Sequence, residues 1–184
     1  MEPNRDERRA RYLAKARAEI GALAKHGVVM TGNAFSSVLL LKGEPTSDER
    51  EGKSLLGGDD GRALHAALQA LGYAPEDWVG LVAWDANGTS LTPELLREAI
   101  CTLDPATLVL CDESATTLVR EAYAEELALL ERFDEAMLME GVVAQVGGMH
   151  MMALGGFAAA LADSHEKQVM WARLKQLPPL GEPY

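Results

Sequence analysis

The sequence predicts an α/β protein built on a mainly parallel sheet. Three short apolar segments, 37–42, 79–84 and 107–111, show little polar alternation, which is typical of parallel strands covered on both faces. Helical patterns at 61–71 and 92–103 lie between these segments. Because strand and helix alternate along the chain, the order favours a parallel sheet.

An amphipathic helix opens the chain. Leu13, Ala16 and Ile20 recur at helical spacing within 5–26, and Gly27 supplies the stop. A turn at Gly32-Asn33 follows this helix. The expected organisation is therefore an N-terminal helical segment, one α/β domain and a proline-containing tail, over 1–27, 28–177 and 178–184.

Local signals place the elements that follow. Thr92 is a helix cap, Pro93 suits the first turn of a helix, and Glu94 lies near the positive end of its dipole. A hairpin is expected around Gly147-Gly148, with apolar residues on both sides. Two more helices are expected, at 114–130 and 164–177.

Length and composition indicate a single soluble domain. The 184 residues, 48% of them hydrophobic, are enough for one sizeable core. The first residues are charged where a signal peptide needs an apolar core, and no segment reaches the roughly 18 apolar residues of a membrane span. We therefore expect a cytoplasmic protein that does not bind membranes. Cys101 and Cys111 lack metal-ligand spacing, and both are expected to be small buried residues.

The charge is distributed unevenly. The formal net charge is −11, yet seven of the 17 basic residues precede Val28, and the remainder carries 24 acidic against 10 basic residues. Binding to a phosphate backbone depends on clustered Lys and Arg, so weak nucleic-acid binding, or none, is expected. The basic first helix is either a local exception or a solvated face.

Acidic residues follow the expected strands. Glu44 follows the first strand, Asp85 the second, and Asp112 and Glu113 the third. Ligands of parallel α/β sheets bind beyond the carboxyl ends of the strands, so these carboxylates are candidates for acid-base chemistry or for binding a cation. The alternative is that they point into water. No metal site is predicted, because three mobile loops supply too few oxygen ligands.

Four blocks in this order resemble the uracil-DNA glycosylase superfamily, and its thermostable bacterial and archaeal branch most closely. The blocks are "TGNAFSSVLLLKGEPTSDEREGKSLLGGDDGRAL", "LGYAPEDWVGLVAWDANGTSLTPELL", "LDPATLVLCDESATTLV" and "EGVVAQVGGMHMMALGGFAAALADSHEKQVMWARLKQL". The resemblance covers roughly residues 28 to 177. It implies a three-layer α/β/α fold around a central, mainly parallel sheet of four strands.

The departures from this family fall where its chemistry lies. Glu44 matches the acid of the first motif, but the uracil-stacking phenylalanine corresponds to Leu55 and the uracil-reading asparagine to Val82. The His-Pro-Ser motif falls on Gly156-Phe157-Ala158, so its anion-stabilising histidine is absent, and His150 is expected to be an ordinary strand residue. The four iron-sulfur cysteines of the family are missing, so no cofactor is expected.

These departures predict a divergent glycosylase-like protein that is impaired or inactive in uracil excision. Glu44 is the candidate catalytic residue, with Asp85 and Asp112 as weaker ones. One alternative is a glycosylase or hydrolase of altered specificity that uses Glu44; another is a protein-interaction module that uses the acidic strand ends or the basic helix. The ligand would be a nucleobase or another small molecule. The remnant pocket is expected to be lined by Gly43, Pro45, Leu55, Val82 and Gly156, together with Glu44.

Overall fold

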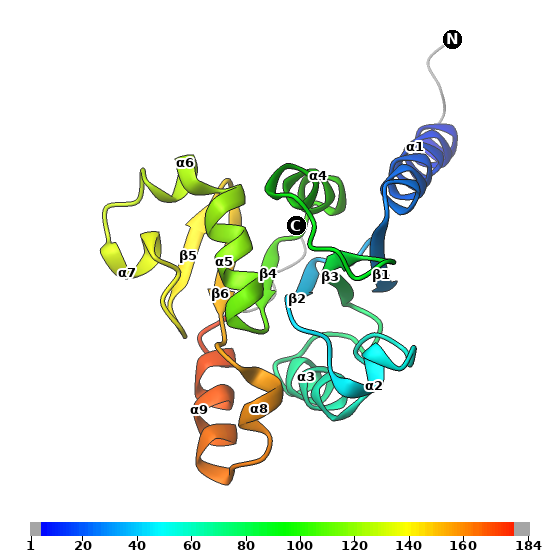
Figure 1. Cartoon of the computed structure of the whole chain (residues 1–184). Helices are drawn as coiled ribbons and strands as arrows, with labels where there is room; N and C mark the ends of the chain where they lie inside the picture. Colours follow the sequence, from blue (N-terminus) through cyan, green and yellow to red (C-terminus); the bar gives the residue numbers. More distant parts are fainter. Residues whose placement is uncertain (1–4, 179–184) are drawn as a thin grey trace.

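A computed structural model describes residues 5–178 and has an α/β fold around one mixed sheet (Figure 1). The sheet has six strands in the order β1-β3-β2-β4-β6-β5. The four inner strands run parallel, whereas β1 and β5 pair antiparallel at the two edges. The strands are β1 Val28–Gly32, β2 Val38–Lys42, β3 Val79–Asp85, β4 Thr107–Leu110, β5 Val143–Val146 and β6 Met149–Ala153.

The expectation of four strands is therefore corrected to six. The sequence pattern predicts no strand at 28–32, although it predicts a turn directly afterwards. This edge segment is buried fully only at Val28, so it lacks the continuous apolar run that marks an inner strand. The predicted hairpin at Gly147-Gly148 is present and contributes β5 as well as β6.

Helices pack on both faces of the sheet (Figure 1). One apolar core joins the sheet to α1, α4 and α5, and a second joins it to α3, α8 and α9. Short helices α2, α6 and α7 lie in the connections. The helices are α1 Arg5–Lys25, α2 Ser47–Arg50, α3 Asp59–Ala70, α4 Pro93–Leu103, α5 Glu113–Ala122, α6 Ala124–Leu127, α7 Phe133–Ala136, α8 Phe157–Ala160 and α9 Ser164–Leu174.

Two of the expected helices are shorter than the sequence predicts. The helix expected over 114–130 ends at Ala122, because Tyr123 leaves the helical region at φ −119° and ψ 25°, and the chain restarts as α6. The final helix ends at Leu174 rather than at 177. The expected tail over 178–184 lies outside the described residues, apart from Pro178.

Alternation along β2 sends its side chains to opposite cores. Leu39 and Leu41 belong to the core under α1, α4 and α5, while Val38 and Leu40 belong to the core under α3 and α9. Lys42 continues the second series and is 2% exposed, so its side chain enters the α3 side of the sheet. This lysine places a buried charge at the end of an otherwise apolar strand.

Membrane crossing is not supported by any described helix. Among residues 5–178, no helix combines the length and the apolar character that a span requires. The longest helix, α1, is rich in charged residues, and its N-terminal part projects from the body of the protein (Figure 1).

A half-buried histidine packs against an aromatic ring on the α3 side. His65 of α3 stacks on Trp78 with ring centroids 4.0 Å apart, and its Nε2 atom is buried without a hydrogen-bond partner. Burial lowers the pKa of His65, and the nearby charge of Asp60 opposes this shift only in part. The folded state therefore holds this imidazole neutral under conditions in which the unfolded chain protonates it.

Stability is expected to fall with acidification through the titration of His65. The unfolded chain binds a proton near its ordinary pKa of about 6.5, whereas folded His65 binds it only at lower pH. Its contribution to stability is therefore complete above that pH and is lost as the pH falls below it. In urea unfolding between about pH 5 and about pH 7.5, His65→Phe should keep the ring contact and show a smaller pH dependence than the natural protein. An identical pH dependence in both proteins would contradict this assignment.

Candidate functional site

A cavity lies at the carboxyl ends of the parallel strands, the edge where ligands of α/β sheets bind. Its volume is about 200 Å³. The lining comes from the ends of β2 and β4, from the start of α3 and from the segment after β6. The lining residues are Lys42, Glu44, Pro45, Thr46, Asp60, Leu64, Cys111, Asp112, Gly156, Phe157, Ala158 and Ala159.

Asp112 joins the loop after β2 to the start of α5. Its carboxylate accepts hydrogen bonds from the backbone N–H groups of Gly43 at 2.9 and 3.0 Å, of Glu44 at 3.0 Å and of Ala115 at 2.9 Å. Burial raises the pKa of Asp112, and these N–H groups oppose that rise. All the N–H groups point at one carboxylate, so Asp112 acts as a helix cap and a loop anchor.

The close approach of this loop to α5 requires a glycine at position 43. A Cβ atom on Gly43 would collide with the backbone nitrogen of Ala115 and with the Asp112 carboxylate. Gly43 was predicted as a pocket residue, but its role is to let two backbone segments touch. Its neighbour Pro45 does line the cavity, as predicted.

Of the three acids that line this cavity, Asp60 and Asp112 are buried and Glu44 is exposed. The residue is exposed, and its Oε1 atom accepts a hydrogen bond of 2.9 Å from the Ser114 hydroxyl. It lies between the cavity and a second hollow of about 380 Å³, which Glu113 and Glu121 also line. Glu44 can therefore contact both a ligand in the cavity and solvent.

Lys42 is held inside the protein by two carboxylates. Its ammonium lies 2.8 and 2.7 Å from the two carboxylate oxygens of Glu49 and 2.6 Å from Asp60 Oδ2. The side chain of Lys42 is 3% exposed, and those of Glu49 and Asp60 are each 6% exposed. Burial lowers the pKa of Lys42, but the contacts with Asp60 and Glu49 outweigh burial, so the pKa is raised overall.

Glu49 also closes the loop that runs over Lys42. Its carboxylate accepts the backbone N–H of Thr46 at 2.9 Å and that of Leu56 at 2.9 Å. In return, the Thr46 hydroxyl accepts the N–H of Glu49, which completes a capping box on α2. One buried carboxylate thus ties both ends of the 46–56 segment to the end of β2.

Three predicted pocket residues, Gly43, Leu55 and Val82, do not line the cavity. Val82 is fully buried and pairs in register with Lys42, while Leu55 is half-buried and packs against the α3 core. Gly156 does line the cavity, as expected, and the next residue, Phe157, contributes an aromatic ring that is 3% exposed. Phe157 falls on the lost His-Pro-Ser motif, and the sequence does not predict it as a pocket residue.

Of the three candidate catalytic acids, Glu44 and Asp112 come together and Asp85 does not. The charge of Glu44 contributes to the raised pKa of Asp112, which indicates that the two carboxylates interact. Asp85 instead accepts the N–H groups of Asn87 and Thr89 at 2.8 and 2.9 Å, within the turn that follows β3. Asp85 is therefore used to form its own turn.

Histidine is absent from the lining of the cavity. His150 lies in β6 opposite Thr107, the first residue of β4, and this places it at the amino edge of the sheet. The expectation that His150 is a strand residue is confirmed. His65 packs on Trp78 and is not part of the lining.

The two cysteines differ in environment. Cys111 is buried beside the cavity, and burial raises the pKa of its thiol. Cys101, which was expected to be buried, is exposed on α4, with its Sγ atom 4.0 Å from the Tyr123 hydroxyl. Within the part of the chain that the structure describes, no cluster of three or more His, Cys, Asp or Glu residues could hold a metal ion.

Comparison with known proteins adds no family assignment. The chain matches no protein-family model, and no curated protein shows significant similarity to it.

Removing the buried ammonium is expected to destabilise the protein strongly. Lys42→Met would leave the carboxylates of Glu49 and Asp60 buried without a cation, which typically costs about 3–5 kcal/mol. Lys53→Met is the matched control, because Lys53 pairs with Asp48 while 61% exposed, and such pairs contribute about 0–1 kcal/mol. Urea unfolding of both variants measures the difference.

Neutral replacements of Glu49 and Asp60 should offset part of the loss of stability in Lys42→Met. The triple variant Lys42→Met, Glu49→Gln and Asp60→Asn should recover part of the stability lost in Lys42→Met, because neutral side chains are cheaper to bury than unpaired charges. Equal, small losses for Lys42→Met and Lys53→Met would contradict the buried position of Lys42.

Proposed function

We propose that the chain is a divergent member of the uracil-DNA glycosylase superfamily that keeps a small ligand pocket and is impaired in uracil excision. The observation that carries the proposal is the cavity at the carboxyl edge of the parallel strands, which Glu44 borders. Its volume of about 200 Å³ suits a single ring rather than a drug-sized molecule. A nucleobase, or another small planar molecule, is the proposed ligand class.

Two features of the lining support recognition of a flat ring. Phe157 supplies an aromatic ring, which can take part in offset-stacked or edge-to-face contacts with a base. The exposed carboxylate of Glu44 and the hydroxyl of Thr46 also line the cavity, where they can accept hydrogen bonds from ring N–H groups. An aromatic surface with a few polar groups is the usual composition of a small-molecule site.

The same lining supports the loss of efficient uracil chemistry. A uracil anion needs a preorganised donor, but the cavity contains no histidine, asparagine or glutamine. Its one cationic side chain, Lys42, is already bound by two carboxylates. Removing one anion-stabilising donor costs on the order of 100- to 1,000-fold in rate.

A glycosidic hydrolase of altered specificity is the second candidate. It is favoured by Glu44, which is exposed at the cavity and oriented by the Ser114 hydroxyl at 2.9 Å. A carboxylate in this position could activate a water molecule. The acidic lining would suit a substrate whose leaving group does not become an anion.

Uracil release is expected to be very slow. On single- or double-stranded DNA containing uracil, the purified protein should act at least about 100-fold more slowly than an authentic member of the family. Any residual activity that belongs to this site should disappear in Glu44→Gln and persist in Glu51→Gln, which changes an exposed acid outside the cavity lining. Family-level turnover that Glu44→Gln abolishes would refute the proposed impairment.

Ligand binding tests the retained pocket separately. In a thermal-shift series with free nucleobases and nucleosides, a ligand at about ten times its Kd should raise the Tm by about 3 °C or more. Ala159→Phe should abolish the rise, because Ala159 lines the cavity, whereas Ala70→Phe at an exposed position of α3 should preserve it. A rise that is equal in both variants, or no rise with any of these compounds, would contradict a base-sized pocket.

A further inference from the structure

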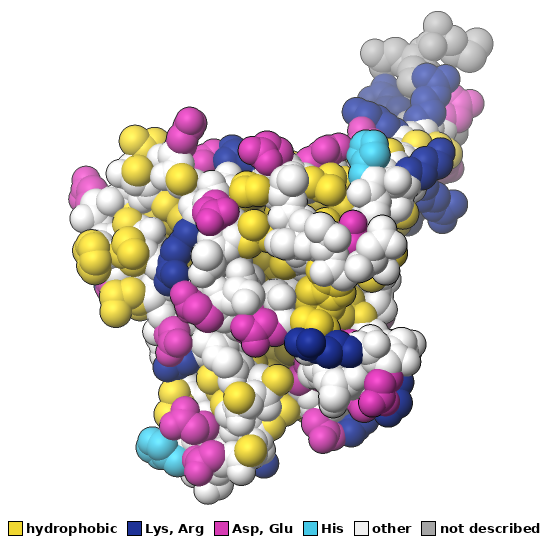
Figure 2. Space-filling model, viewed as in Figure 1, with side chains coloured by type: hydrophobic (Ala, Val, Ile, Leu, Met, Phe, Trp, Pro, Cys, Tyr) yellow, Lys and Arg dark blue, Asp and Glu magenta, His cyan; other side chains and the backbone are white. Residues whose placement is uncertain are grey.

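The first helix carries positive charge that the described part of the protein does not neutralise. Arg5, Arg9, Arg11, Arg17 and Lys25 of α1 are exposed, and within residues 5–178 none of them forms an ion pair. One ion pair on this helix joins Lys15 and Glu19 at 3.6 Å, with both side chains exposed. Figure 2 shows basic side chains gathered over α1, which projects from the body.

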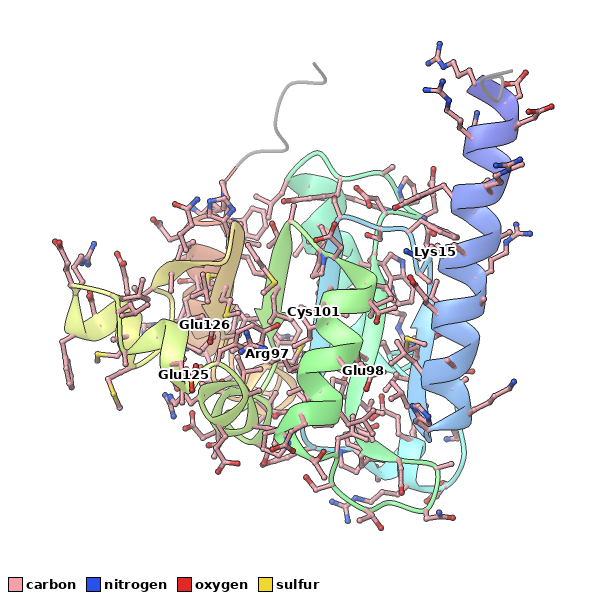
Figure 3. The ribbon with its side chains drawn as sticks, turned by 90° about the horizontal axis from the view of Figure 1, so that it is seen from above. Lys15, Arg97, Glu98, Cys101, Glu125 and Glu126 are labelled. Carbon is pink, nitrogen blue, oxygen red and sulfur yellow. The ribbon has the colours of Figure 1, made fainter. Side chains whose placement is uncertain are left out.

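Arginines elsewhere in the chain are arranged differently. Arg97 pairs with Glu126, and Figure 3 shows these two side chains directed toward each other. Four other arginines outside α1 also form ion pairs: Arg62, Arg120, Arg132 and Arg173. The remaining one, Arg50, donates to a backbone carbonyl. In a protein of net charge −11, the uncompensated arginines are thus concentrated on one helix.

The length of α1 explains why this charge surrounds the helix. Its 21 residues span about 31 Å, whereas β1, against which it packs, has five residues and spans about 17 Å. The N-terminal half therefore extends past the sheet, as Figures 1 and 3 show. Residues 5–12, more than two turns of the helix, are all exposed, and Tyr12 is 68% exposed.

The projecting half of α1 points away from the cavity. Val28, at the start of β1, pairs with Asp85 at the carboxyl end of β3. The C-terminal end of α1 therefore lies at the carboxyl edge of the sheet, and its N-terminal half lies beyond the amino edge. A polymer bound there is not presented to the cavity of the same molecule.

The chemistry of this surface favours a phosphate backbone over a protein or a membrane. Its cations are mostly arginines, whose planar guanidinium groups match phosphate oxygens in pairs. Apart from Tyr12, the apolar residues exposed between them are small alanines, such as those at 10, 14 and 18, which offer little of the apolar area that a protein interface or a lipid surface needs. Regularly spaced phosphates can contact charges on several sides of one helix.

We propose that the projecting half of α1 is a docking surface for the phosphate backbone of a nucleic acid, without sequence preference. The acidic remainder of the chain repels the same polymer, so affinity is modest and falls steeply with salt. The surface acts as a tether that is separate from the cavity and independent of its ligand.

Fluorescence polarisation with the full chain tests this surface. The probes are labelled single-stranded and duplex DNA of scrambled sequence, titrated between about 50 and about 200 mM salt. The test variant changes Arg5, Arg9 and Arg11, which all lie in the projecting half of α1, to Gln. The control changes Lys53, Arg62 and Arg132 to Gln, which alters net charge equally at residues that are 61–69% exposed and paired elsewhere.

The test variant should bind at least about 10-fold more weakly at the lowest salt, and its salt slope should fall by up to about 0.9 per lost phosphate contact. The control should stay within about threefold of the natural protein, and circular dichroism should show both variants folded. Equal losses in the two variants, or no binding by the natural protein, would overturn the proposal. So would a salt-sensitive dimer in sedimentation that only the α1 variant abolishes, because the occupant would then be a second copy of the chain.

Discussion

The structure around the candidate site depends on one buried ammonium group. Lys42 ends a strand whose preceding residues are entirely apolar, and its charge must be neutralised where water is excluded. Glu49 and Asp60 meet this requirement from two different segments. The chain between β2 and the start of α3 must therefore fold back over Lys42, so the position of this loop follows from a charge balance rather than from apolar packing.

The same loop defines the cavity. Its beginning is fixed by Asp112, which collects N–H groups from Gly43 and Glu44, and its far part is fixed by Glu49. The buried carboxylates of Asp112 and Glu49 thus bind backbone N–H groups, while the carboxylate of Glu44 remains exposed at the edge of the sheet. A site organised in this manner keeps a shaped pocket but has no uncommitted cation in its lining. This division is the physical basis for proposing a retained pocket with weakened chemistry.

Much of the fold could be predicted from local patterns, because inner strands such as Val38–Lys42 are continuous apolar runs and helices such as Pro93–Leu103 carry clear caps. Edge strand β1 was missed, since a half-buried strand of five residues has no such signal. At the site, the sequence predicts Glu44 and Asp112 as edge residues and Pro45 and Gly156 as pocket residues, and all four line the cavity. The pairing of Lys42 with two distant acids was not, because spacing along the chain does not reveal which carboxylates fold over a buried lysine.

Buried ion pairs at Lys42 hold the 46–56 loop closed over the end of β2. Native-state hydrogen exchange at the N–H groups of Thr46 and Leu56, which both donate to Glu49, measures this directly. These two loop amides should exchange nearly as slowly as amides of the inner strands. Rapid exchange at both, while the inner strands stay protected, would show that the loop opens freely and would contradict this role of the ion pairs.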